Sequence, residues 1–125
     1  MKILYIDTTE PLIHIALWKD EVFIEKKKES RFHSVYLIDT IKESLNELKL
    51  KLHNIDVFVV NIGPGSFTGT RVGILTAMGF SKIFNKKLVY LKKNEDYKTI
   101  PSIVDSKQNN DEVVAVYNGL SYFER

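Results

Sequence analysis

Cysteine is absent from the 125 residues. Without thiols the chain has no disulfide framework and no thiolate for catalysis or metal binding, and it suits a reducing compartment. The apolar run at residues 1–6 is too short for a signal peptide, and Asp7 interrupts it. No stretch approaches the roughly 20 apolar residues that cross a bilayer. We therefore expect a cytoplasmic protein without a membrane segment.

An excess of either charge is also missing. Eighteen basic and sixteen acidic residues give a formal charge of +2. This near balance does not favour a nucleic-acid binder. The short lysine runs at 26–28 and 92–93 are interleaved with acidic residues, so we interpret them as solvated strand ends or loops, with a weak RNA contact as the alternative.

Histidine is sparse and scattered. His14, His33 and His53 have neither the i,i+4 spacing nor the neighbouring ligands of a metal site, so we expect none. The sequence also lacks a Gly-x-Ser-x-Gly motif, and no serine or threonine has an obvious base beside it. We therefore expect no catalytic residue and no self-contained active site.

The first part of the sequence predicts an antiparallel meander. Residues 2–7, 13–18 and 21–28 are rich in β-branched and aromatic residues and are separated by tight turns. After them the apolar period becomes helical, which predicts an amphipathic helix over residues 34–52.

The second part predicts a parallel β-α-β unit. An almost continuous apolar run at 55–62 predicts a central strand covered on both faces, followed by a helix at 66–85 and a strand at 88–91. Residues 92–99 are polar and irregular. Two last strands are expected at 100–105 and 112–117, and the whole of residues 1–125 is expected to form one α/β domain.

Small residues follow one another at four-residue intervals along the second helix. They are Gly65, Gly69, Gly73, Ala77 and Ser81. Each glycine inside a helix costs about 0.8–1.0 kcal/mol relative to alanine, so the close approach of another backbone is expected to offset it. The helix is apolar nearly all round, so either the fold wraps it or a partner protein covers it.

Two features could bind an anion or a cation. The turn at Gly63 lies between a strand and a helix, where a phosphate cradle is conceivable, but it lacks the Gly-Lys-Ser/Thr of a P-loop. The alternative is a tight turn with close helix packing. Asp7 ends the first strand beside Thr8, where it could hold a metal or a water, or simply form the turn.

Five segments, in order, carry a family resemblance. They are ILYIDTT at 3–9, RFHS at 31–34, GPGSFTGTRVG at 63–73, VDSK at 104–107 and EVVAVY at 112–117. Together they resemble the TsaB (YeaZ) family, and the segment at 63–73 is the most specific. The resemblance implies one lobe of the actin-like ATPase (ribonuclease H-like) fold, a mixed sheet with three antiparallel strands plus parallel βα units.

The function implied by the resemblance is that of a non-catalytic dimerisation or activating subunit. It would pair with TsaD, together with TsaE and ATP, for N6-threonylcarbamoylation of adenosine 37 in ANN-decoding tRNAs, and would meet tRNA only indirectly. The chain alone would bind no cofactor, with ATP and Mg²⁺ held only in the complex with TsaD. The same surface would allow a homodimer.

The resemblance also assigns the site residues. The partner interface maps to the helices at 34–52 and 66–85, through Val35, Ile38, Ile41, Leu45, Gly69, Arg71, Gly73, Ile74, Ala77, Met78 and Ser81. The family motif loop is Gly63, Pro64, Gly65, Ser66, Phe67 and Thr68, and Asp7 and Thr8 would be a vestigial phosphate or metal site. A Gly73→Leu change is expected to abolish pairing without unfolding the sheet.

Two departures from the pattern bear on the alternatives. Family members usually carry a second lobe, which we expect to be absent here. The His-x-x-x-His of TsaD is also absent, because Leu37 follows His33 by four residues. Both weigh against the alternative function, a nucleotide-binding phosphotransfer or ATPase domain that uses Asp7 and the Gly63 turn. A protease, the third alternative, has no nucleophile–base pair to support it.

Overall fold

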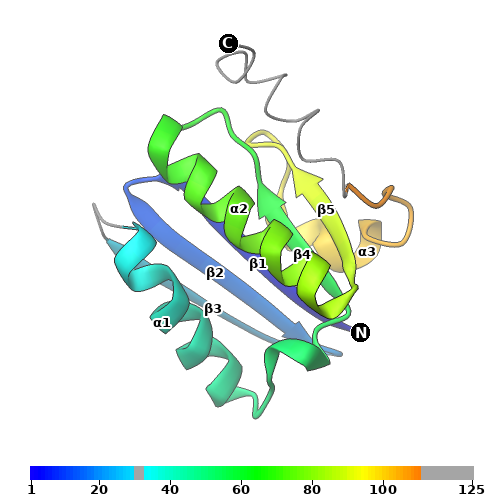
Figure 1. The fold of residues 1–125 in the computed structure, drawn as a ribbon. Helices are drawn as coiled ribbons and strands as arrows, with labels where there is room; N and C mark the ends of the chain where they lie inside the picture. Colours follow the sequence, from blue (N-terminus) through cyan, green and yellow to red (C-terminus); the bar gives the residue numbers. More distant parts are fainter. Residues whose placement is uncertain (30–32, 111–125) are drawn as a thin grey trace.

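The computed structural model describes residues 1–29 and 33–110. They form one five-stranded mixed sheet in the order β3-β2-β1-β4-β5, with helices on both faces (Figure 1). The strands are β1 (Lys2–Glu10), β2 (Leu12–Lys19), β3 (Val22–Glu29), β4 (Val57–Asn61) and β5 (Lys87–Leu91). The helices are α1 (His33–Glu47), α2 (Phe67–Phe84) and α3 (Ile100–Ile103), with 3-10 turns η1 (Leu52–Asn54) and η2 (Tyr97–Thr99).

The predicted antiparallel meander is confirmed. β1 pairs with β2, and β2 pairs with β3, both antiparallel. The β2–β3 turn places Asp20 at a φ of 56°, and its carboxylate accepts a hydrogen bond from the chain's N-terminal ammonium at 2.6 Å. These turns are short enough for consecutive strands to lie side by side, as the sequence predicts.

The parallel unit is confirmed too. β4 pairs in parallel with both β1 and β5, and α2 makes the crossover between β4 and β5. All five residues of β4 are buried, in agreement with the prediction of a strand covered on both faces. The mixed α/β fold class follows from these two halves.

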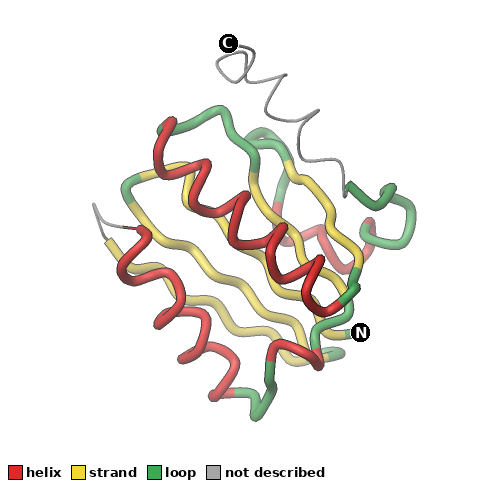
Figure 2. The backbone as a smooth tube through the Cα atoms, viewed as in Figure 1, coloured by secondary structure: helices red, strands yellow, loops and turns green. Residues whose placement is uncertain are grey.

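The sheet separates two apolar layers. α1 and α2 lie on one face, with Leu4, Ile6 and Phe58 among the residues buried beneath them (Figure 2). On the other face η2 and α3 cover the centre of the sheet, where Ile100 and Val104 pack against β1, β4 and β5. The two layers make the central strands inaccessible to water. A ligand or partner can therefore contact only the ends of the sheet and the outer surfaces of the helices.

The prediction of a strand at residues 100–105 is wrong. The segment is the short helix α3, with Pro101 near its start, where a missing N–H costs nothing. Its apolar residues, together with Tyr97, recur at intervals of three and four rather than two, which is the helical period. The predicted strand at 112–117 lies outside the described residues.

The first helix ends earlier than predicted. α1 stops at Glu47, because Lys49 takes a left-handed conformation with φ of 56°. The amide of Leu50 then bonds to the carbonyl of Leu45 at 2.9 Å, and the Leu50 side chain turns into the core. The leucines past residue 47 keep the helical spacing in the sequence, but they contact the core from a turn and not from a further stretch of helix.

Candidate functional site

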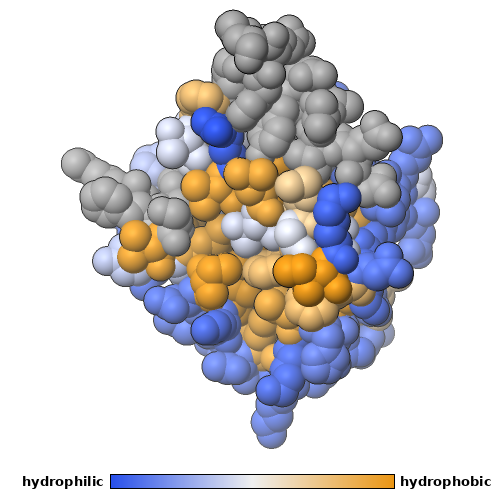
Figure 3. Space-filling model, viewed as in Figure 1, coloured by the Kyte–Doolittle hydropathy of each residue, from blue (hydrophilic) through white to orange (hydrophobic). Residues whose placement is uncertain are grey.

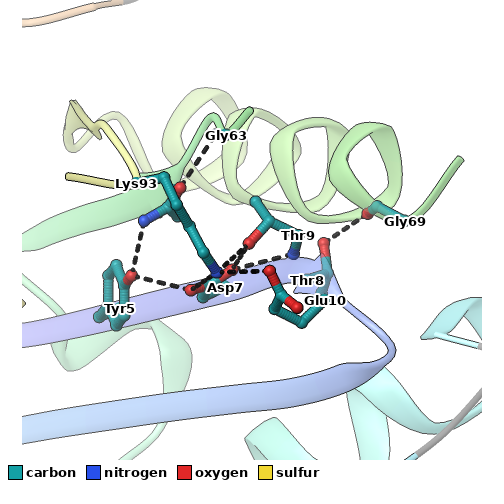
Figure 4. A network of polar contacts seen from close by, with 9 residues as sticks. Tyr5, Asp7, Thr8, Thr9, Glu10, Gly63, Gly69 and Lys93 are labelled. Carbon is teal, nitrogen blue, oxygen red and sulfur yellow. Dashed lines mark hydrogen bonds and ion pairs between the residues drawn. The ribbon is translucent and has the colours of Figure 1, made fainter. Parts of the chain in front are cut away.

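The carboxyl ends of β1, β4 and β5 meet at one edge of the sheet, where open α/β sheets usually bind ligands. Asp7 lies near the end of β1, Asn61 ends β4, and Lys93 follows β5 by two residues. They line a pocket of about 250 Å³ whose walls also include Tyr5 and Tyr97. Figure 4 shows the polar contacts that gather there.

Lys93 makes the central contacts of this edge. Its ammonium donates a hydrogen bond to Thr9 Oγ1 at 2.7 Å and lies 3.2 Å from Glu10 Oε2 and 3.7 Å from Asp7 Oδ2. Its backbone amide donates to the Gly63 carbonyl at 3.0 Å. The loop after β5 is therefore tied to both the β1 hairpin and the Gly63 turn.

Asp7 is held from the other side by its own strand. Its Oδ1 accepts hydrogen bonds from the Thr9 amide at 2.9 Å and the Thr9 hydroxyl at 2.6 Å, while the Tyr5 hydroxyl lies 3.3 Å from Oδ2. Asn61 donates to that tyrosine oxygen at 3.0 Å. Burial, and then the Asp7 charge, raise the pKa of Tyr5 well above its ordinary value, so the phenol stays protonated.

The outer wall of the pocket is a second polar cluster. His14 Nε2 lies 3.0 Å from Glu25 Oε1, and the Tyr97 hydroxyl donates to the same carboxylate at 2.9 Å. The Tyr97 ring stacks on Tyr5 and meets His14 edge-on. Burial lowers the pKa of His14, and burial with the Glu25 hydrogen bond raises that of Tyr97 to about 12.

The Gly63 turn brings α2 against the β1 hairpin. Gly63 has a φ of 92°, which favours glycine. A Cβ on Gly65 would lie 2.5 Å from the Thr9 carbonyl oxygen, and one on Gly73 would collide with the Thr8 hydroxyl. Gly65 thus admits the backbone of β1 and Gly73 admits the Thr8 side chain, so at these two positions of the ridge the close approach is made by the chain's own β1.

The groups considered for phosphate binding are engaged internally. The Thr8 hydroxyl donates to the Gly69 carbonyl at 2.5 Å and accepts from the Gly73 amide at 3.1 Å. At the start of α2 the Ser66 amide donates to the Thr9 carbonyl at 2.8 Å, and the Ser66 hydroxyl caps the Gly69 amide at 3.2 Å. This geometry is that of a tight turn with close helix packing.

Most of the residues assigned to a partner interface point inward. Val35 and Ile38 are exposed, with 60% and 40% of their surface accessible, and Arg71 and Met78 are half-buried. The others are buried in this chain's own core: Ile41, Leu45, Gly69, Gly73, Ile74, Ala77 and Ser81. Because these seven lie on the buried sides of α1 and α2, a surface contact has to be made by other side chains.

The outward side of α2 carries its own apolar residues and one glycine. Leu75 and Ile83 are 45% and 73% exposed, and a Cβ on Gly79, between them, would meet no atom of residues 1–29 and 33–110 within 4 Å. Figure 3 shows apolar side chains across the middle of the face that α1 and α2 form, with hydrophilic ones at its border. We call this the outer helix face, made of Val35, Tyr36, Ile38, Phe67, Leu75, Gly79 and Ile83.

Sequence reasoning missed Lys93, Asn61 and Tyr97. Asn61 ends a predicted strand, which could have marked it, but no functional motif surrounds Lys93 or Tyr97 in the sequence. Within residues 1–29 and 33–110 no three His, Cys, Asp or Glu side chains gather as a metal site. In the same part of the chain, no helix is both long and apolar enough to cross a membrane.

Comparisons with known proteins agree with this fold. The family model described as "TsaD: tRNA N6-adenosine threonylcarbamoyltransferase" matches residues 24–116. The tRNA threonylcarbamoyladenosine biosynthesis protein TsaB of Escherichia coli strain K12 is 34% identical over 82 residues, which cover 65% of this chain and 36% of that protein. TsaB of Buchnera aphidicola subsp. Baizongia pistaciae is 34% identical over 80 residues, covering 63% and 36%.

Solved structures share the architecture. YeaZ from Pseudomonas aeruginosa superposes with a TM-score of 0.72 at 22% identity, over 74% of this chain and 45% of that one. The chain spans about a third of the length of the curated TsaB proteins that it matches. Since the family model covers more than half of its residues, the chain belongs to the family that this model describes, as a protein of the TsaB (YeaZ) type.

Proposed function

We propose that this chain acts in the biosynthesis of N6-threonylcarbamoyladenosine in tRNA, as a non-catalytic activating subunit that pairs with TsaD. With TsaE and ATP, the pair would modify adenosine 37 of ANN-decoding tRNAs, and this chain would meet tRNA only through its partners. The observation that carries the proposal is the outer helix face, whose exposed apolar residues and half-buried glycine do not belong to the core formed by the described residues.

Gly79 gives the clearest argument. A glycine inside a helix costs about 0.8–1.0 kcal/mol relative to alanine. Gly73 offsets that cost by admitting Thr8, whereas the space beside Gly79 is open. Leu75 and Ile83 lie one turn before and after Gly79, so they share its side of the helix. A helix of another protein could approach closely at Gly79 and cover both apolar side chains.

α1 extends the same surface. Tyr36 and Ile38 each expose 40% of their surface, and Val35 exposes 60%. Two neighbouring helices with apolar outer residues can form half of a helical bundle, in which a partner contributes the other helices. We take TsaD to be this partner because the family model that matches residues 24–116 is the one described as TsaD.

Support for a non-catalytic role comes from the strand-end pocket. Asp7, Thr9, Glu10 and Lys93 contact one another, and the Thr8 hydroxyl is used in helix packing. A homodimer through the outer helix face is an outcome that the same experiments detect. ATP and Mg²⁺ would be held by the complex and not by this chain alone.

The test is co-purification of this chain with TsaD. Gly79→Gln and Ile83→Asp place bulk or charge on the outer helix face and should each weaken pairing at least tenfold. Lys98→Gln, an exposed change in η2 on the opposite side of the sheet, is the matched control. Gly73→Leu is unsuitable, because Gly73 packs on Thr8 and its enlargement would disturb the chain's own fold.

Pairing that survives both Gly79→Gln and Ile83→Asp, in folded protein, would contradict the proposal. Light scattering of the chain alone distinguishes a homodimer from a monomer. The alternative function, nucleotide binding through Asp7 and the Gly63 turn, is favoured only by the pocket's place at the carboxyl ends of the strands. ATP binding by the isolated chain that Asp7→Ala removes would support it.

A further inference from the structure

The end of β1 presents the kind of oxygen ligands that divalent cations prefer. Asp7 and Glu10 supply carboxylates and Thr9 supplies a hydroxyl, all within reach of one point. Carboxylate and hydroxyl oxygens are typical ligands of Mg²⁺ and Mn²⁺. Because an actin-like fold implies ATP with Mg²⁺, the residues at this point have to be examined for their fit to a cation.

The fit fails because a cation is already there. The Lys93 ammonium lies 2.7 Å from Thr9 Oγ1, 3.2 Å from Glu10 Oε2 and 3.7 Å from Asp7 Oδ2. A divalent ion bound to the same three groups would lie within a few ångströms of the lysine nitrogen. Two positive charges at that distance repel each other even at this partly exposed place, where water weakens the repulsion, and the ammonium already satisfies part of the negative charge.

The hairpin groups that could face a phosphate are occupied as well. The Thr9 amide donates to Asp7 Oδ1 at 2.9 Å. The Thr8 hydroxyl bonds to both Gly69 and Gly73 in α2. Neither the carboxylate nor the hairpin can take an Mg²⁺-bound phosphate without giving up these contacts.

We infer that Lys93, although partly exposed, is an intramolecular counter-ion, which takes the place of a divalent cation at the end of β1 and ties the loop after β5 to the β1 hairpin (Figure 4). Removal of its ammonium uncovers a latent divalent-cation site made of Asp7, Glu10 and Thr9. This inference is independent of the pairing with TsaD.

The loop holds its position without the lysine side chain. The Lys93 amide donates to the Gly63 carbonyl, and the Lys92 amide donates to Glu95 Oε1 at 2.8 Å. Lys107 forms an ion pair with Glu95 at 3.1 Å. These bonds fix the backbone of the loop, so a change of the Lys93 side chain alone should leave the surrounding oxygens in place.

The experiment is a titration of the whole chain with Mn²⁺, followed by electron paramagnetic resonance of the free ion. Lys93→Met should bind one Mn²⁺ at least about tenfold more tightly than the wild-type protein, since removal of a unit charge within a few ångströms exceeds one tenfold step. Lys92→Met, the same change one residue earlier, is the control and should resemble the wild type. Adding Asp7→Asn to Lys93→Met should abolish the gain.

Urea unfolding establishes that each variant is folded. If Lys93→Met does not fold, Lys93→Gln, which retains a hydrogen-bond donor, takes its place with the same expectation. Wild-type protein that binds Mn²⁺ as tightly as Lys93→Met overturns the inference, and so does a folded Lys93 variant that binds no better than Lys92→Met. ATP binding by the wild-type chain through Asp7 overturns it too, and none of these outcomes depends on TsaD.

Discussion

The hydroxyl of Thr8 in β1 accepts a hydrogen bond of 3.1 Å from the amide of Gly73 in the middle of α2. The two residues are 65 positions apart in the sequence, and only a residue without a side chain allows this contact. Gly79, on the outward side of the same helix, has open space beside it. Two glycines six residues apart therefore have opposite roles, one in the fold and one at the surface.

We expect Gly73→Ala to destabilise the protein by about 1–3 kcal/mol, as for other substitutions that overpack a core. The added methyl group would collide with the Thr8 hydroxyl and push α2 away from β1. Urea unfolding of the purified chain measures the change. A Gly73→Ala variant as stable as the wild type would show that the contact is looser than the structure indicates.

Gly79→Ala should have the opposite sign and raise the free energy of unfolding by up to about 1 kcal/mol. No atom of the described residues lies within 4 Å of the added methyl group, and alanine has the higher helix propensity. The same urea experiment measures it, with Gly73→Ala as the reference. A loss of stability in Gly79→Ala would mean that Gly79 packs inside the chain after all.

A pH dependence follows from His14. Burial lowers its pKa below the ordinary 6.5, so the unfolded chain takes up a proton at a higher pH than the folded chain. The free energy of unfolding should therefore fall as the pH drops through 6.5, and His14→Gln should flatten this part of the profile. Glu25, Lys27 and Asp7 are the charged groups that act on His14.

The control for this profile is His53→Gln, because His53 is exposed. Glu25 titrates at a lower pH than His14. Burial acts to raise the pKa of Glu25, but hydrogen bonds from Tyr97 and His14 hold it below 4.5. Its share of the stability should be lost only as the pH falls through that lower range. A profile that is identical in the wild type and His14→Gln between pH 7.5 and 5 would refute the prediction.

Ile100→Ala should cost about 2–5 kcal/mol, the range for truncation of a large buried side chain. Ile100 is fully buried, and α3 covers the sheet face opposite α1 and α2. Urea unfolding again supplies the measurement, with the exposed Lys98→Ala as the control. Equal stability of the two variants would show that α3 does not contribute to the core.

Local pattern accounts for much of the fold. The alternation of apolar and polar residues and the apolar runs located all five described strands, and the helical period located α1 and α2. Each of these signals depends only on residues within a single element. The same reasoning failed at α3, because a four-residue helix offers too few positions for its helical spacing to be told from a short strand. The family motif at 63–73 was readable for the same reason, since it is one continuous stretch.

The sequence by itself determined the strands, the main helices, the Gly63 turn and the family. Tertiary structure decided which side of α2 faces outward, because a helix that is apolar nearly all round does not define its own inner face. It also decided that Lys93 reaches Thr9, 84 residues away, and so lies beside Asp7. That contact depends on the order of strands in the sheet, which brings the ends of β1 and β5 together and which no local spacing encodes.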